Sequence, residues 1–168
     1  MNLEELFAQF TIWSNSVVAS LGYFGIFLVS FAGSASIILP VPFFAMIFAL
    51  GAVLNPWMIG VSAGLGSALG EITGYVIGKG GGDAIEKKHK KFFDKGRKLF
   101  EHDQAFIAII LFAATPLPDD ILGIIAGMFD YDLRKFLIAS FIGKTIMCLA
   151  LAWGGFYGIR WTLTVFGG

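Results

Sequence analysis

The sequence contains few charged residues, one cysteine and two histidines, and each shortage excludes a class of function. Only 14% of the 168 residues are charged, whereas about 25% is usual in a soluble domain. With Cys148 as its one cysteine, the chain cannot build a disulfide framework. His89 and His102 lie in a polar segment without metal-ligand spacing, so we expect no metal site, no cofactor and no enzymatic activity. The 57% of hydrophobic residues instead predicts an integral membrane protein of one domain.

The basic residues are concentrated in one segment. No lysine or arginine precedes Lys79, and eight of the twelve lie between Lys79 and Lys98. Because cytoplasmic loops carry an excess of basic residues, we predict that residues 79–103 are cytoplasmic in a multi-pass protein of the plasma or inner membrane. Contact with anionic lipid headgroups accounts for such a cluster, so nucleic acid is not an expected partner.

A pair of prolines occurs twice, each time within an apolar run. The prolines are Pro40, Pro42, Pro116 and Pro118, and a shift of 76 residues places the first pair on the second. The same shift places Gly51 on Gly127. Two prolines at this spacing interrupt a helix, and at membrane depth the freed carbonyl groups need partners in protein or in a wet cavity. Repeated helix breaks of this kind are typical of transporter substrate sites, so we predict two re-entrant helical hairpins.

Apolar runs and turn residues predict an all-α fold in six parts. These are an interfacial helix (1–22), a first re-entrant hairpin (23–54), a transmembrane helix (56–79), the basic loop (80–103), a second re-entrant hairpin (104–130) and a second transmembrane helix (134–158). For the polar first segment, a poor transmembrane helix is the alternative. A re-entrant hairpin returns to its own side, whereas the first transmembrane helix crosses once. The two hairpins must therefore enter from opposite faces, which makes the fold an inverted repeat.

Glycines recur every fourth residue along one face of the first predicted transmembrane helix. They are Gly66, Gly70, Gly74 and Gly78, and Gly82 continues the spacing. Glycine at this spacing lets a neighbouring backbone approach closely. We therefore predict tight helix packing along this face.

Four ionisable residues are predicted at membrane depth, where a charge is costly and usually functional: Glu71, Asp119, Asp120 and Lys144. Glu71 lies about 12 Å and Lys144 about 15 Å from the cytoplasmic end of its helix. Their matched depths predict an ion pair, which is either purely structural or part of a transport path. Asp119 and Asp120 follow the second proline pair, where they would cap the returning half-helix, handle protons or a ligand, or do both.

Residues 70–82 read Gly-Glu-Ile-Thr-Gly-Tyr-Val-Ile-Gly-Lys-Gly-Gly-Gly. This resembles the signature Gly-acidic-x-x-x-Tyr-x-x-Gly-basic-x-x-Gly of the DedA family, in the VTT (SNARE-associated) superfamily. The second proline pair, the Ala-Gly-Met at 126–128, Phe136 and Gly143 resemble the second half of that family. The resemblance covers roughly residues 23–158. It implies two facing re-entrant hairpins and the movement of lipids across the bilayer, since bacterial members are linked to polyprenyl-phosphate recycling and proton-coupled homeostasis, and eukaryotic relatives are phospholipid scramblases.

The sequence departs from the family pattern at both hairpins. Residues 31–36 contain no acid ahead of the first proline pair, and Thr115, Asp119 and Asp120 occupy the neighbourhood where arginines usually flank the second. We predict a translocase or scramblase for polyprenyl phosphate or phospholipid, coupled to protons, to a monovalent cation or to neither. A proton-coupled exporter of small cations and a non-transporting adaptor, whose basic loop recruits partners, are the alternatives. A homo-oligomer is compatible with each.

Overall fold

The computed structural model describes residues 3–36, 43–86, 103–115 and 120–166, and every regular element in these ranges is an α-helix. The helices are α1 (Leu3–Leu21), α2 (Tyr23–Ala35), α3 (Phe43–Gly51), α4 (Pro56–Gly70), α5 (Ile72–Glu86), α7 (Asp103–Ala113), α8 (Asp120–Met128) and α9 (Leu133–Phe166). The all-α prediction is confirmed. The four hairpin prolines, Asp119, His89 and His102 lie outside the described residues.

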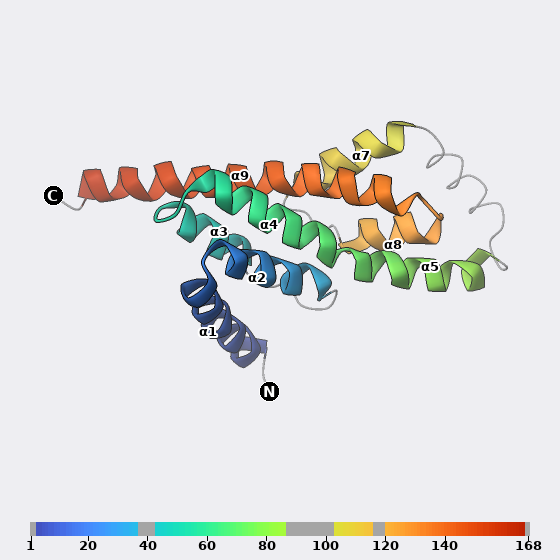
Figure 1. The fold of residues 1–168 in the computed structure, drawn as a ribbon, viewed down its shortest axis with the longest axis horizontal. Coiled ribbons are helices and arrows are strands. Elements are labelled where there is room, and N and C mark those ends of the chain that lie inside the picture. Colours follow the sequence, from blue (N-terminus) through green and yellow to red (C-terminus); the bar gives the residue numbers. More distant parts are fainter. Residues whose placement is uncertain (1–2, 37–42, 87–102, 116–119, 167–168) are drawn as a thin grey trace.

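Two long helical rods form the frame of the molecule. The first is α4 followed by α5, and the second is α9, which has 34 residues and is therefore about 51 Å long. The rods run in opposite directions along the long axis, and α4 packs against α9 (Figure 1). Within α9, residues Leu133–Gly158 form the one described helix that is long and apolar enough to cross a membrane.

The predicted transmembrane helix 56–79 is interrupted at Glu71 and extends further than expected. The Thr73 hydroxyl donates to the carbonyl oxygen of Gly70 (2.8 Å), a bond that competes with the regular helical ladder. The backbone is nonetheless bonded on both sides of Glu71, whose N–H donates to Ser67 O and whose carbonyl accepts from Tyr75 N–H. The interruption is therefore local, and the rod continues beyond it.

Two predicted boundaries were too early. Helix α5 ends at Glu86, within the segment expected to be a loop from residue 80, and α9 continues eight residues beyond 158. Gly80, Gly81 and Gly82 were interpreted as the start of a loop because glycine is a poor helix former. A preceding helix can continue through such a stretch once it has been nucleated.

Four short helices lie within the two predicted hairpin segments. Helices α2 and α3 have 13 and 9 residues, and α7 and α8 have 11 and 9. Their lengths of about 14–20 Å are well below the roughly 30 Å thickness of a bilayer's hydrocarbon core. The short helices lie where the sequence predicted half-helices, and their re-entrant path through a membrane stays a prediction.

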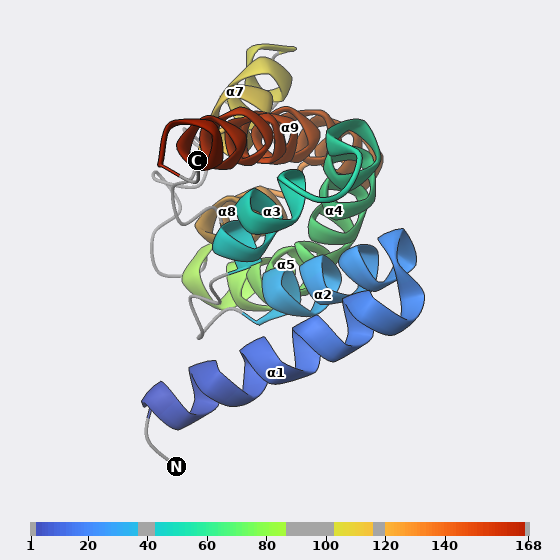
Figure 2. The same cartoon turned by 90° about the vertical axis from the view of Figure 1, so that its left-hand side faces the viewer.

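The short helices pack on the rods in a reciprocal pattern. Helix α2 packs on α4 and α7 packs on α9, so the first short helix of each repeat contacts the rod of its own repeat. Helix α3 packs on α9 and α8 packs on α5, so the second short helix contacts the rod of the other repeat. Figures 1 and 2 show α3 and α8 enclosed between the two rods. The halves of the chain are thus interlocked.

Equivalent glycines make the closest of these contacts. A Cβ atom at Gly51 would collide with the carbonyl oxygen of Ala152, and one at Gly127 would collide with that of Tyr75. The shift of 76 residues that relates Gly51 to Gly127 relates Ala152 to Val76, the neighbour of Tyr75. The repeat seen in the sequence is therefore also a repeat of contacts.

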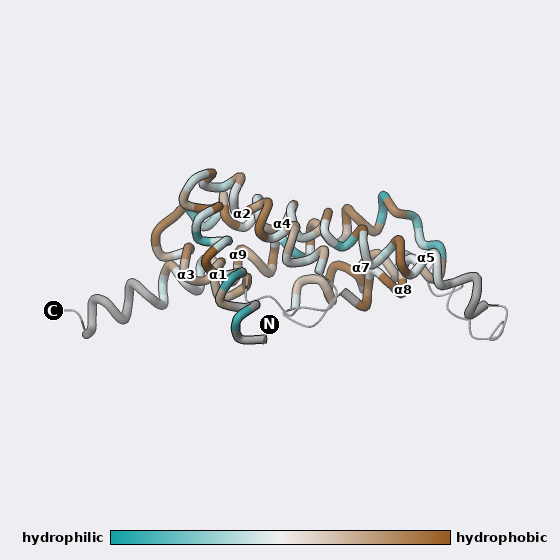
Figure 3. Tube along the Cα trace, turned by 90° about the horizontal axis from the view of Figure 1, so that it is seen from below, coloured by the Kyte–Doolittle hydropathy of each residue, from teal (hydrophilic) through white to brown (hydrophobic). Residues whose placement is uncertain are grey.

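Helix α1 lies outside the bundle and packs on α2 (Figure 2). Gly22 separates the two helices with a φ of +57°, a conformation that glycine adopts readily. In Figure 3, hydrophilic residues gather on α1 and near the end of the molecule where α5 lies. Residues 3–21 are helical as predicted, and their position on or across a membrane stays a prediction.

Because Gly51 and Gly127 make equivalent contacts, we expect Gly51→Ala and Gly127→Ala to destabilise the protein to a similar degree. Each added methyl group would press on a backbone carbonyl that cannot rotate away, at a cost of about 1–3 kcal/mol. Thermal unfolding in detergent measures the effect. Gly80→Ala is the control, because a Cβ there meets nothing within 4 Å. Losses that differ strongly between the two variants would contradict the equivalence.

Candidate functional site

The two rods carry different chemistry at their two ends. At one end the Trp57 ring packs edge-on against Trp153, with ring centroids 6.0 Å apart, and Tyr157 stacks on Trp153 at 5.4 Å. At the other end Lys79 Nζ lies 3.4 Å from Asp130 Oδ1 in an exposed ion pair. Exposed tryptophan and tyrosine rings are typical of a membrane–water interface, and exposed charges of the aqueous side beyond it.

The distance between the two ends fits a bilayer. Along α9, Lys135 and Trp153 are eighteen residues apart, which is about 27 Å in an α-helix. The hydrocarbon core of a bilayer is about 30 Å thick. Lys144 lies nine residues from each of them, at the middle of this apolar stretch.

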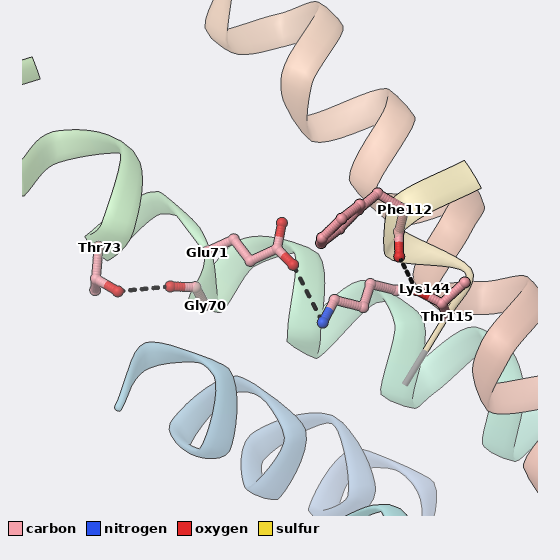
Figure 4. A network of polar contacts seen from close by, with 6 residues as sticks. All are labelled: Gly70, Glu71, Thr73, Phe112, Thr115 and Lys144. Atoms are coloured by element: carbon pink, nitrogen blue, oxygen red, sulfur yellow. Dashed lines mark hydrogen bonds and ion pairs between the residues drawn. The ribbon is translucent and has the colours of Figure 1, made fainter. Parts of the chain in front are cut away.

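Lys144 pairs with Glu71 at this middle level. Lys144 Nζ lies 3.2 Å from Glu71 Oε1, and the side chains are 2% and 1% exposed, respectively. Figure 4 shows Lys144 extending from α9 toward Glu71, which lies where α4 gives way to α5. The predicted pairing of these two residues is thus present in the structure.

Glycines next to both charged residues let short helices approach them. A Cβ at Gly70 would lie 2.7 Å from the carbonyl oxygen of Phe31 in α2, and one at Gly143 would lie 2.6 Å from that of Ile110 in α7. The predicted close packing along the glycine face is seen at Gly66 and Gly70, which meet α2, and at Gly78, which meets α8.

The pair separates two apolar clusters. One cluster includes Ile59 of α4 and Met147 of α9, and the other includes Tyr75 of α5 and Phe136 of α9. In such surroundings a lone charge is strongly destabilising, whereas a hydrogen-bonded pair is tolerated. Each charge therefore depends on the presence of the other.

Buried hydroxyl groups near the pair were not predicted from the sequence. The hydroxyls of Ser30, Ser67, Ser140 and Thr145 are buried and have no hydrogen-bond partner among the described residues. An unsatisfied buried hydroxyl costs about 1–3 kcal/mol. Ser67 lies one turn before Glu71, and Ser140 one turn before Lys144.

A sequence signal for these serines exists, but at a different spacing from the proline repeat. Residues 67–71 read Ser-Ala-Leu-Gly-Glu and residues 140–144 read Ser-Phe-Ile-Gly-Lys, so Ser-x-x-Gly-charged recurs after 73 residues. A search at a shift of 76 misses it. The structure reveals it because both glycines contact the first short helix of their own repeat.

Two further polar side chains brace the first rod. The Thr73 hydroxyl, besides its bond to Gly70, lies 3.3 Å from the carbonyl oxygen of Ala35 at the end of α2. The Tyr75 hydroxyl donates to the carbonyl oxygen of Tyr131 (2.5 Å), and its ring packs on Phe136 at 5.7 Å. Sequence reasoning matched Tyr75 to a family signature without a structural role.

The other predicted site residues are only partly placed. Asp120 is the first residue of α8, and its side chain lies outside the described part of the structure, as does all of Asp119. Gly123, one turn later, packs 3.0 Å from the carbonyl oxygen of Glu71, measured from a Cβ built on it. Helix α8 therefore begins near the ion pair. Among the described residues, no group of three or more histidine, cysteine, aspartate or glutamate side chains could hold a metal ion.

Comparison with known proteins agrees with the two-repeat architecture. The model of the VTT domain matches residues 41–157. The chain belongs to the VTT domain family. This family is membrane-associated and linked to transport, and the resemblance drawn from residues 70–82 is confirmed.

A relative of similar length is known from an archaeon. The uncharacterized protein MJ0201 of Methanocaldococcus jannaschii is 29% identical to this VTT domain protein over 152 residues, which cover 84% of this chain and 87% of the relative. No solved structure matches the chain.

We expect Glu71→Gln or Lys144→Met alone to lower the stability more than the two together. Either single change leaves a buried charge without its partner, at a cost of about 3–5 kcal/mol, whereas the double variant removes both charges. A double-mutant cycle of unfolding free energies in detergent measures the coupling. Lys79→Met is the control, because its exposed pair with Asp130 should contribute about 0–1 kcal/mol. Additive losses at Glu71 and Lys144 would contradict the coupling.

Proposed function

We propose that this VTT domain protein moves lipids across the bilayer, as a translocase or scramblase for a polyprenyl phosphate or a phospholipid. The observation that carries the proposal is that short helices from both repeats end or begin beside a buried ion pair halfway along the rods. Such interrupted helices let a polar group approach the centre of a membrane at lower cost than continuous apolar helices do.

The ends of α2 and α3 support a re-entrant path for the first hairpin. The Tyr23 hydroxyl, at the start of α2, accepts from the N–H of Asn55, which caps α4 at the tryptophan end of the rods. The other end of α2 lies beside Gly70 and Thr73, near the middle. Helix α3 starts against Gly33 of α2. Its last residue packs on Ala152, next to Trp153 at the tryptophan end. The segment thus leaves and regains one end of the rods.

The second hairpin has the opposite orientation. Helix α7 begins in the cluster that contains Tyr131 and Phe136, near the charged end, and its last residue packs beside Gly143 at the middle. Helix α8 begins near Glu71 and ends at the level of Lys79, which a Cβ at Gly127 would contact. These contacts favour two hairpins that enter from opposite faces.

In the proposed mechanism the headgroup moves along the protein while the apolar tails stay in the bilayer. The facing hairpins shorten the purely hydrocarbon part of the path, which lowers the cost of moving a charge or a polar group through it. Glu71, Lys144, Asp119 and Asp120 would line or gate this path. The process breaks no covalent bond, so it requires no catalytic residue.

The buried carboxylate also favours one alternative, a proton-coupled exporter of small cations. A carboxylate that loses and regains a proton at mid-depth can couple transport to a pH gradient. Lys144 argues against direct cation binding at Glu71, because its ammonium group already occupies the position next to the carboxylate.

We expect the tryptophan end to face away from the cytoplasm and the charged end to face it. In a Cys148→Ala background, Val53→Cys and Gly80→Cys place one thiol at each end, at positions that are exposed in the structure. A membrane-impermeant maleimide added to intact cells should label the first position and not the second. If both positions label from the same side, the proposed inverted topology is wrong.

We expect the purified protein to scramble fluorescent lipids in proteoliposomes, and Glu71→Gln to reduce the rate at least tenfold while Lys79→Met does not. Bleaching of labelled phospholipid or polyprenyl phosphate by dithionite measures the rate. Asp119→Asn and Asp120→Asn should leave the protein folded, slow transport and flatten its pH dependence. If both behave as the wild type between pH 5.5 and 8.5, these aspartates act only as caps. Cation movement driven by a pH gradient, without lipid movement, would favour the exporter instead.

A further inference from the structure

We propose that the centre of the bundle is a water-binding site, in which the buried hydroxyls of Ser67 and Ser140, with Ser30 and Thr145 beside them, hold ordered water next to the Glu71–Lys144 pair. This inference concerns the chemistry of the site, and it holds whether the transported species is a lipid or a cation.

The first argument is the selective lack of backbone bonds at these hydroxyls. A helical serine usually donates back to a carbonyl oxygen one turn earlier. Ser20 and Ser36 do so, with distances of 2.9 Å to Ser16 O and Ala32 O. The four central hydroxyls have no such partner among the described residues, although they are buried. Buried polar atoms that lack a protein partner are commonly satisfied by ordered water.

The second argument is location. Ser67 and Ser140 each precede a member of the ion pair by one helical turn. Thr145 follows Lys144 directly, and its backbone lies within 3 Å of a Cβ built on Gly64 in α4. Ser30 belongs to the stretch of α2 that packs on Gly66, the neighbour of Ser67. The four hydroxyls therefore lie at the junction of α2, α4 and α9, close to the level of the pair.

The third argument is the equivalence of the two halves of the site. Ser-x-x-Gly-charged occurs once in each repeat, and the two copies meet at the rod crossing with opposite charges. One half offers a carboxylate, the other an ammonium group, and both offer a hydroxyl. Water donates and accepts hydrogen bonds, so it can satisfy both halves, whereas a metal cation would be repelled by the ammonium group.

Hydration would give the pair a property that a dry pair lacks. Protons exchange through hydrogen-bonded water, so a hydrated Glu71 or Lys144 can change its protonation during transport. Water also replaces part of the lost interaction when the pair separates. The site would thus make the central charges able to respond to a passing group.

The sign of a stability change tests the proposal. If the hydroxyls hold water, Ser67→Ala and Ser140→Ala should each lower the unfolding temperature by about 2–4 °C. If the site is dry, removal of an unsatisfied hydroxyl should raise it. Ser62→Ala is the matched control, because Ser62 lies on the same helix as Ser67 in a partly exposed position, and it should have no effect.

A direct measurement of water keeps the test decisive if a variant does not fold. In the wild-type protein in lipid bilayers, solid-state NMR should detect magnetisation transfer from water to the Lys144 Nζ group, and the Ser67→Ala/Ser140→Ala variant should lose most of it. No transfer in the wild type, or stabilisation by both alanine substitutions, would overturn the proposal. Neither measurement depends on transport, so a failure here is distinct from a failure of lipid scrambling.

Discussion

The buried ion pair between Glu71 and Lys144 is the interaction on which the rest of the arrangement depends. Both charges lie in the middle of an apolar bundle, with an apolar cluster on either side. Because neither charge is tolerable alone in such surroundings, the pair fixes the position at which the two rods cross. Each repeat contributes one charge, so neither repeat can form its half of the centre independently.

Reciprocal packing distributes this dependence over the whole molecule. The second short helix of each repeat lies on the rod of the other repeat, held there by contacts that a side chain as small as alanine would disturb. Contacts at Gly51 and Gly127 are equivalent, as are those that link Gly78 to Ile124 and Gly155 to Phe48. A movement of one repeat must therefore displace the short helix of the other, and with it the surroundings of the central pair. Such coupling suits a protein that admits a polar group from two sides.

The candidate site was only partly predictable from sequence. Glu71 and Lys144 were recognisable because a charge in an apolar run is rare, and their matched depths predicted the pair. The hydroxyls at Ser67 and Ser140 carried no such signal, since serine is common in membrane helices and its bonding depends on the rotamer. The interruption at Glu71 was missed for a similar reason. It rests on the Thr73 hydroxyl, whose choice of the Gly70 carbonyl is made by local packing and not by helix propensity.

Composition and periodicity alone determined that this chain is helical, apolar and built from two related halves, because these properties follow from how many charges a segment contains and where prolines and glycines interrupt it. The resemblance of residues 70–82 to a family signature was also contained in the sequence, and the match over residues 41–157 confirms it. Only the tertiary structure decided which short helix packs on which rod, that α5 and α9 continue beyond their predicted ends, and that four hydroxyls surround the central charges. These features depend on contacts between residues far apart in the chain, and a local pattern specifies the face that a helix buries without specifying the partner that covers it.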